Sequence, residues 1–264
     1  VVSFTNAFHG MTAGALALTG NASKRAGAGV PLNNVTTMPF DGYMGKDVDT
    51  LDYFEKTLKD AGSGIDTPAA VIVETVQGEG GINLAGWQWL RRLRAICTQY
   101  DILMIVDDIQ MGCGRTGPFF SFEPAAVKPD LICLSKAISG LGLPMALVLI
   151  RPDLDIWKPG EHNGTFRGNN LAFVSAAKAL DYWRDSTLEE DVAIKGRRIR
   201  ERLSEIVDAH PEANLRVRGR GMVQGLVSEE EGLAVDICQE AFENGLVMET
   251  AGVDDQVAKV MPPL

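Results

Sequence analysis

Ala-Ala-Val-Ile-Val-Glu-Thr-Val, residues 69–76, is an almost continuous apolar run, which is typical of a strand buried inside a parallel sheet. Residues 86–100 follow it with apolar side chains at helical spacing, among them Leu90 and Leu93. Residues 102–106 form a second apolar run. The order of strand, helix and strand predicts an α/β arrangement.

The same alternation continues along the chain. Residues 131–134 and 145–150 are further apolar runs of strand length, and residues 170–184 and 187–210 predict two long helices. The second of these helices is amphipathic and heavily charged on one side. Together these elements predict a large domain with a mostly parallel sheet.

The pattern changes after residue 210. Short strands are predicted at residues 215–218, 222–227 and 246–250, around a helix at 233–244. This is an α+β arrangement, so we expect a large domain over residues 1–208 and a smaller C-terminal domain over residues 209–264.

Composition limits the kinds of partner. The chain has 264 residues, 45% of them hydrophobic, and a formal net charge of −10, which argues against nucleic acid or an anionic membrane as the main partner. No apolar run is long enough to span a membrane, and the first residues do not form a signal peptide. The four cysteines are far apart, so we expect reduced, mostly buried thiols in a cytoplasmic protein. Both ends of the chain are expected to continue into further sequence.

Polar residues gather where three predicted strands end. The three stretches are 74–81 (Glu-Thr-Val-Gln-Gly-Glu-Gly-Gly), 107–110 (Asp-Asp-Ile-Gln) and 135–136 (Ser-Lys). Functional residues of such sheets lie at the carboxyl ends of strands. A lone Lys136 is most often a surface residue and a lone Asp107 most often caps a turn, but together they are costly to bury unless they are paired or bound to something.

The combination suits pyridoxal 5'-phosphate (PLP). This cofactor requires a lysine amine, a carboxylate beside its pyridine nitrogen, donors for its phosphate and flat apolar groups on its ring faces. A nicotinamide-binding domain is a weaker interpretation, because residues 78–81 do not match the dinucleotide fingerprint. No metal site is predicted, since the three histidines are dispersed.

The sequence resembles the class III aminotransferases, the family of ornithine, acetylornithine and 4-aminobutyrate transaminases. The resemblance covers nearly the whole chain and rests on seven motifs in family order. They are Phe8-His9-Gly10, residues 74–80, residues 107–110, Gly114-Arg115-Thr116-Gly117, Pro129-Asp130 with Ser135-Lys136, Gly164-Thr165 and Pro262-Pro263-Leu264. The resemblance implies the PLP-dependent transferase fold of type I.

The resemblance also implies roles for individual residues. Lys136 would hold PLP as a Schiff base and act as the general base. Asp107 would pair with the pyridine nitrogen, and Gln110 would bind the phenolic oxygen. The family motif is Asp-Glu-Val-Gln where this chain has Asp-Asp-Ile-Gln, and both changes are conservative.

The other cofactor-binding residues follow from the same resemblance. Phe8 and Ile109 would pack on the two faces of the ring, although core packing is the commoner role of such side chains. His9 and Glu74 would lie beside the ring. Thr165 would reach the phosphate bound by a neighbouring subunit, so a homodimer or homotetramer with shared active sites is expected.

Two residues are expected to bind substrate. In several family members an arginine stands at the position of Lys259 and clamps the carboxylate of glutamate, while a glutamate at the position of Glu79 pairs with it. Lysine keeps the charge but lacks the bidentate fork. Glu79 and Lys259, with Arg167 as a further candidate, would switch between substrates that react at an α-amine and at an ω-amine.

Residues 140–147 and 155–170 resemble most closely the diaminobutyrate transaminases, including those of ectoine biosynthesis. This implies transfer of an amine from L-glutamate to L-aspartate 4-semialdehyde, which gives L-2,4-diaminobutyrate and 2-oxoglutarate. Diaminobutyrate transaminases of siderophore or diaminopropane pathways, other ω-aminotransferases of the class, an aminomutase, a decarboxylase and a domain that only binds PLP remain alternatives. The glycine–hydroxyl turn that binds the phosphate in this family precedes the Phe-His motif and is not in this chain.

Overall fold

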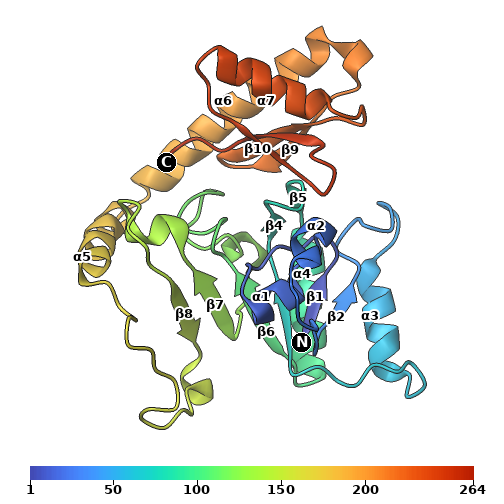
Figure 1. The fold of residues 1–264 in the computed structure, drawn as a ribbon, viewed down its shortest axis with the longest axis vertical. Helices are drawn as coiled ribbons and strands as arrows, with labels where there is room; N and C mark the ends of the chain where they lie inside the picture. The colour runs from blue at the N-terminus through green and yellow to red at the C-terminus, as the bar shows by residue number, and fades with distance from the viewer.

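Two β-sheets lie one above the other in the computed structural model, which describes residues 1–264 (Figure 1). The lower sheet has six strands in the order β2-β1-β3-β6-β7-β8. Their bounds are Val2–Phe4 (β1), Thr36–Met38 (β2), Ala70–Val73 (β3), Leu103–Asp107 (β6), Leu131–Leu134 (β7) and Leu147–Ile150 (β8). The first five strands run parallel, and only β8 is antiparallel to its neighbour.

This part of the chain contains five α-helices, two of which have six residues or fewer. They are α1 (Ala13–Leu18), α2 (Ala22–Ala26), α3 (Thr50–Lys59), α4 (Trp87–Gln99) and α5 (Asn170–Ala179). Single 3-10 turns lie at η1 (Glu123–Ala125), η2 (Lys136–Ser139), η3 (Pro152–Leu154), η4 (Leu180–Trp183) and η5 (Pro211–Ala213). Asp49 begins α3 by accepting a hydrogen bond from the backbone N–H of Leu51 at 3.0 Å, as an N-cap residue does.

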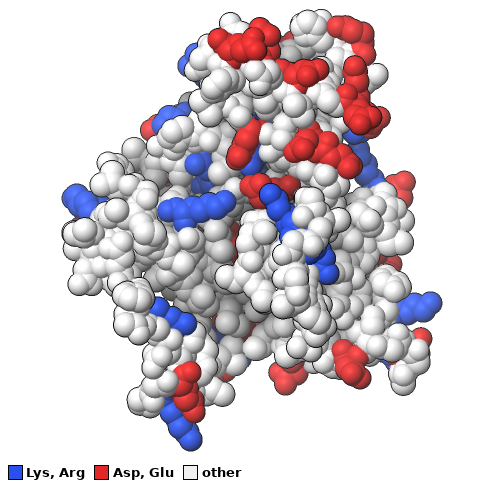
Figure 2. All heavy atoms as spheres, in the orientation of Figure 1, with Lys and Arg blue, Asp and Glu red and all other residues white.

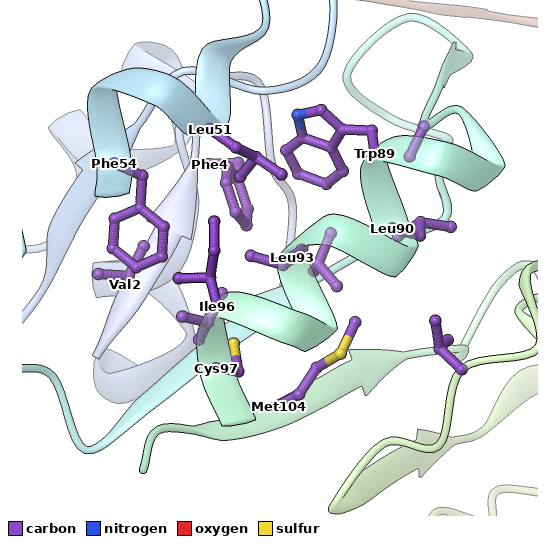
Figure 3. Close-up of a cluster of buried hydrophobic side chains, with 14 of the residues drawn as sticks. Val2, Phe4, Leu51, Phe54, Trp89, Leu90, Leu93, Ile96, Cys97 and Met104 are labelled. Carbon is purple, nitrogen blue, oxygen red and sulfur yellow. The ribbon is translucent and has the colours of Figure 1, made fainter. Parts of the chain in front are cut away.

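The main core lies between α3, α4 and the lower sheet (Figure 3). Helix α4 directs Trp89, Leu90 and Leu93 into this core, and all three side chains are buried. The indole N–H of Trp89 donates to the hydroxyl of Thr50 at 2.9 Å, so its one polar atom is satisfied inside the core. Burial of this helical face is what the spacing of apolar residues in the sequence predicted.

The upper sheet is antiparallel, with strand order β11-β12-β10-β9. Its strands are β9 (Arg216–Arg220), β10 (Val223–Val227), β11 (Glu249–Ala251) and β12 (Val257–Val260), and it carries α6 (Thr187–Ala209) and α7 (Leu233–Glu243). A small hairpin, β4 (Val76–Gln77) with β5 (Asn83–Leu84), extends from the lower sheet and meets β9. Acidic side chains gather on the upper part in the view of Figure 2.

The predicted fold class is confirmed, since a mostly parallel sheet precedes a smaller α+β part. The domain boundary at residue 208 stays a prediction. Helix α6 packs against β9 and β10, which favours grouping this helix with the upper sheet rather than with the lower one.

Two expectations for the upper sheet need correction. The strand predicted at 246–250 forms at Glu249–Ala251. Strand β12 was not predicted, because Lys259 interrupts a short apolar run and hides its strand character. The lysine is tolerated because its ammonium meets carboxylates across the sheet.

All four cysteines are free, as predicted. Cys97 and Cys113 are buried, whereas Cys133 and Cys238 are only half-buried. No helix of the structure is both long enough and apolar enough to cross a membrane.

Replacing Leu93 by alanine tests the core. Leu93 is completely buried, so we expect Leu93→Ala to lower the free energy of unfolding by about 2–5 kcal/mol, through lost burial and the cavity left behind. Urea unfolding measures the change. Gln88→Ala, an exposed position on the same helix, should stay within about 0.5 kcal/mol of the wild type. Equal effects of the two substitutions would contradict the assignment of α4 to the core.

Candidate active site

The site forms where parallel strands end at the same edge of the lower sheet. Asp107 is the last residue of β6, Glu74 follows β3 directly, and Lys136 comes two residues after β7. Because β3, β6 and β7 are parallel neighbours, their carboxyl ends meet at one edge. Segments up to 62 residues apart in sequence are thereby brought to one place.

One cavity at this edge collects most of the residues predicted from the sequence. Its lining consists of Phe8, His9, Gly10, Glu74, Glu79, Asp107, Ile109, Gln110, Met111 and Lys136. Eight of these ten were predicted, and Gly10 and Met111 are the additions. Both additions are chain neighbours of predicted residues.

Asp107 is held at both of its oxygens. Its Oδ2 lies 2.7 Å from Nδ1 of His9, and its Oδ1 accepts a hydrogen bond from the backbone N–H of Ile109 at 3.1 Å. His9 Nε2 is buried and has no hydrogen-bond partner within the chain. A wall of the cavity thus contains a fixed carboxylate and an unsatisfied ring nitrogen, and buried polar atoms normally have a partner.

Lys136 faces the cavity without a partner of its own. No hydrogen bond or ion pair within the chain involves its ammonium, in contrast to Lys259. Burial lowers the pKa of Lys136, while the charge of Glu79 opposes this change. Its backbone has φ of +50°, a left-handed conformation that is uncommon for residues other than glycine and is typical of functional positions.

Glu74 is a buried carboxyl in the lining of the cavity. Its carboxylate accepts a hydrogen bond from the backbone N–H of Phe8 at 3.0 Å, which ties the segment after β1 to the end of β3. Burial and the nearby charge of Asp107 raise the pKa of Glu74 well above its ordinary value. Glu74 therefore keeps its proton to a higher pH than an ordinary glutamate does.

A carboxylate–ammonium–carboxylate group adjoins the cavity through Glu79, whereas the predicted substrate-binding Lys259 is buried behind it and is not part of the lining. The ammonium of Lys259 is 3.0 Å from Glu79 and 2.8 Å from Glu249. Gln110 also donates a hydrogen bond to Glu79, at 3.1 Å. Although burial alone would raise the pKa of Glu79, the charge of Lys259 and the hydrogen bond from Gln110 hold it below its ordinary value.

Gln110 depends on a glycine beside it. A Cβ atom added at Gly78 would lie 1.7 Å from Oε1 of Gln110, so any larger residue at position 78 would displace the amide. The glycine in the 74–81 stretch thus keeps space for a cavity-lining side chain.

Thr165 and Arg167 lie outside this cavity. Both are exposed on the segment between η3 and α5, and Arg167 donates its nearest hydrogen bond to the ring of His162 at 2.7 Å. The roles predicted for Thr165 and Arg167 stay predictions.

A buried polar network connects the site to the upper sheet. Asp108 accepts hydrogen bonds from the backbone N–H of Ser121, at 3.0 Å, and from its hydroxyl. Arg220 of β9 reaches Thr75 at 3.2 Å and lies over the ring of Trp87, 3.9 Å from its centroid. Burial raises the pKa of Asp108 to about 6 and lowers the pKa of Arg220 to about 10.

Two further motifs, Gly114-Arg115-Thr116-Gly117 and Pro262-Pro263-Leu264, are joined by hydrogen bonds and have a structural role. Arg115 of the Gly-Arg-Thr-Gly motif donates to the backbone carbonyls of Met222, at 3.2 Å, and of Pro262. The motif therefore joins the lower part of the chain to the segment that follows β12.

Sequence reasoning missed Glu249. The residue stands directly opposite Lys259 in the register of β11 and β12. Only that register indicates the contact, because Glu249 belongs to no motif and lies at the start of a short strand.

A larger cavity of about 460 Å³ lies at the opposite edge of the lower sheet. Two of its three arginines, Arg94 and Arg151, pair with Asp130, so their charges are already compensated. The chemistry-bearing side chains lie in the other cavity.

Known proteins match this chain over its whole length. The model of the family "Aminotransferase class-III" matches residues 1–264. The chain is 55% identical over 264 residues to the diaminobutyrate–2-oxoglutarate transaminase of Halalkalibacterium halodurans, covering 100% of this chain and 62% of that protein. The protein of the same name from Bordetella parapertussis is 56% identical over 266 residues, and 61% of it is covered. The chain thus spans about three fifths of the length of these relatives.

Solved structures show the same fold. The ornithine aminotransferase of Toxoplasma gondii superposes with a TM-score of 0.85 at 28% identity, over 99% of this chain and 59% of that one. The N-acetylornithine aminotransferase of Stenotrophomonas maltophilia superposes with a TM-score of 0.74 at 28% identity, again over 99% of this chain and 59% of the other.

The raised pKa of Asp108 predicts a pH dependence of stability. The folded state holds the proton of Asp108 more tightly than the unfolded state does, so this group's contribution to stability falls as the pH rises above about 4. Between pH 5 and pH 8 the fall amounts to about 1 kcal/mol. Over this range we expect the free energy of unfolding of Asp108→Asn to fall by about 1 kcal/mol less than that of the wild type. Urea unfolding measures the difference. The exposed Asp254→Asn serves as a control that should follow the wild type, and equal pH slopes for all three proteins would refute the prediction.

Proposed function

The chain belongs to the class III aminotransferases, and from this premise we propose that the protein is a PLP-dependent diaminobutyrate–2-oxoglutarate transaminase. It would move an amine from L-glutamate to L-aspartate 4-semialdehyde and release 2-oxoglutarate and L-2,4-diaminobutyrate. The main observation in support of the proposal is that one cavity is lined by Lys136, which has no ion-pair partner, together with Asp107 and Gln110. The names of the relatives at 53–56% identity supply the substrates.

The side chains of the cavity fit PLP. Asp107 is anchored by His9 and Ile109, so its carboxylate is already positioned for a ring N–H. The unsatisfied Nε2 of His9 is a polar atom that a ligand or water can satisfy. Phe8 and Ile109, from the segments after two different strands, would provide the apolar contacts on the ring. When bound, the cofactor supplies an electron sink that stabilises negative charge on the substrate carbon.

The protein side chains would position the reactants and move the proton. Lys136 would hold the cofactor and then carry a proton between substrate carbon and cofactor. Its lowered pKa favours this role, because more of the amine is in the neutral, basic form at a given pH. Glu74, with its raised pKa, would keep a second proton near Asp107. Gln110, whose amide oxygen occupies the space that Gly78 leaves open, would donate to an oxygen of the ring through Nε2.

Glu79 and Lys259 would allow the site to accept a different substrate in each half-reaction. With Glu79 paired to Lys259, the cation is covered and the site accepts a substrate that reacts at its terminal amine. When Glu79 moves away, the ammonium of Lys259 would bind the α-carboxylate of glutamate. Lysine contributes a point charge here, so the contact is expected to be less directional than that of an arginine.

We also propose an oligomer with shared active sites in the cytoplasm. Apolar side chains are exposed on and before α5, with Phe166 at 98%, Leu171 at 72% and Val174 at 71% of their full accessibility. An apolar patch of this kind is typical of a protein interface. Thr165 lies in the same exposed segment, which suits a residue that serves the neighbouring subunit. The four free cysteines suit a reducing compartment.

Replacing Lys136 by alanine tests the proposed function in the full-length protein with PLP. We expect turnover to fall by about a thousandfold or more, because Lys136 is the only free amine in the cavity. The visible absorbance of the covalently held cofactor should disappear as well. Lys128→Ala, at an exposed lysine elsewhere, should retain both properties. A Lys136 variant that transaminates normally would overturn the assignment.

Single-turnover reactions with glutamate distinguish a transaminase from an aminomutase or decarboxylase. A transaminase converts the cofactor to its amine form and releases 2-oxoglutarate, whereas an aminomutase retains the amine on the product. Retention of the amine, or release of carbon dioxide, would refute the proposal.

Truncation of Glu79 tests the switch. Because Glu79 has to leave Lys259 only when glutamate binds, we expect Glu79→Ala to change the rate of the glutamate half-reaction about tenfold more than that of the diaminobutyrate half-reaction. Rapid mixing with each amine donor measures the two rates. Glu243→Ala, an exposed glutamate on α7, should leave both rates unchanged. Equal changes of the two half-reactions in the Glu79 variant would rule out the switch.

A further inference from the structure

A second cavity of about 350 Å³ adjoins the candidate active site. The two cavities share Phe8 and Glu79 in their walls. On one side the second cavity is lined by Asn21 and Lys24 at the start of α2, and on the other by Glu249 and Gly252 of the β11–β12 hairpin. Its volume suffices for the non-reacting end of an amino-acid substrate whose other end lies at Lys136.

The hairpin wall of this cavity is held in place by hydrogen bonds. The backbone N–H of Gly252 donates to the carbonyl of Glu79 at 2.9 Å, which attaches the hairpin to the segment after β4. Thr250 donates to Asp255 at 2.7 Å, across the turn of the hairpin. Glu249 therefore extends from a fixed backbone, and only its side chain has to adapt to a ligand.

The charges at the junction of the two cavities do not balance. Glu79 and Glu249 bring two carboxylates to the single ammonium of Lys259, which leaves a surplus of one negative charge. Lys259 is almost completely buried, whereas the side chain of Glu249 is 73% exposed. The surplus negative charge is thus presented to a ligand by Glu249.

Glu249 and Lys24 have free binding capacity on opposite walls. One oxygen of Glu249, Oε1, contacts Lys259, and the other makes no contact with a donor within the chain. Lys24 is exposed, and its ammonium has no carboxylate within 4.0 Å. An anion on one wall and a cation on the other match a zwitterion, in which an ammonium and a carboxylate are carried by one carbon atom.

We propose that this second cavity binds the α-amino-acid head of the substrate that reacts at its terminal amine, with Glu249 receiving the α-ammonium and Lys24 the α-carboxylate. The inference rests on the proposed transaminase function and names the residue that selects its diamino substrate. Glu249 is a specificity-determining residue, because it would contact the substrate at the end that does not react.

The proposed contact distinguishes among the possible amine donors. L-2,4-diaminobutyrate carries an α-ammonium beside its carboxylate, whereas 4-aminobutyrate has the same chain and terminal amine but lacks the α-ammonium. Glutamate, which reacts at its α-amine, has only a carboxylate at the far end. Of these three compounds, only diaminobutyrate can pair with the surplus charge of Glu249. Lys136 lines the first cavity and Glu249 the second, and the two cavities share Phe8 and Glu79 in their walls, so one small substrate could reach both residues.

The experiment uses the full-length protein loaded with PLP and compares diaminobutyrate with 4-aminobutyrate as amine donors to 2-oxoglutarate. In Glu249→Gln we expect KM for diaminobutyrate to rise about tenfold or more, with kcat little changed, because a charge-assisted hydrogen bond is lost. KM for 4-aminobutyrate should stay unchanged or fall. Lys24→Gln should raise KM for both donors alike, since both carry the carboxylate.

Asp254→Asn is the matched control, because this exposed carboxylate lies in the same hairpin but outside the cavity lining. It should behave as the wild type with both donors. If Glu249→Gln weakens both donors by the same factor, or leaves diaminobutyrate unaffected, the inference is wrong while the transaminase function stands. If the wild-type protein converts neither glutamate nor diaminobutyrate, the proposed function itself fails.

Discussion

Parallel pairing of β3, β6 and β7 is the constraint on which the rest of the site depends. It requires that the residues after these strands lie at one edge of the sheet, whatever their separation along the chain. Asp107 and Lys136 share a cavity for this reason and not because of a local motif. The apolar runs that form the strands also exclude water from below, so the polar residues at their ends interact in a partly desolvated environment.

The upper sheet contributes residues to the candidate active site that forms at the edge of the lower sheet. Lys259 comes from β12, Glu249 from β11 and Glu79 from the segment after β4, so this charged group exists only when the two sheets are in contact. The contact is made by polar as well as apolar groups. Arg115 and Arg220 each bridge the two parts of the chain through hydrogen bonds. A shift of the upper sheet would therefore change the charge that a substrate meets.

Burial gives neighbouring carboxylates different properties. Asp107 is fixed by His9 and a backbone N–H, whereas Asp108, next to it in sequence, points to Ser121 and has its pKa raised to about 6. The pKa of Glu74 is also raised by burial, and the pKa of Glu79 is lowered by the charge of Lys259. Carboxylates with different pKa values at one site allow some to hold protons while others remain charged, which is the arrangement that acid–base chemistry requires.

The sequence alone was sufficient for the fold class and for eight of the ten residues that line the candidate active site. Apolar periodicity identifies strands and helices, because burial requires one face of each element to be apolar. The residues that follow those strands are then candidates for function, and the resemblance to the family adds Phe8 and His9. Glu249 and strand β12 could not be predicted in this way, because the contact of Glu249 with Lys259 depends on the register between β11 and β12. The second cavity likewise arises from the approach of α2 to the β11–β12 hairpin, segments more than two hundred residues apart. Local sequence patterns report which face of an element is buried, whereas only the tertiary structure decides which elements meet and which charges are left without a partner.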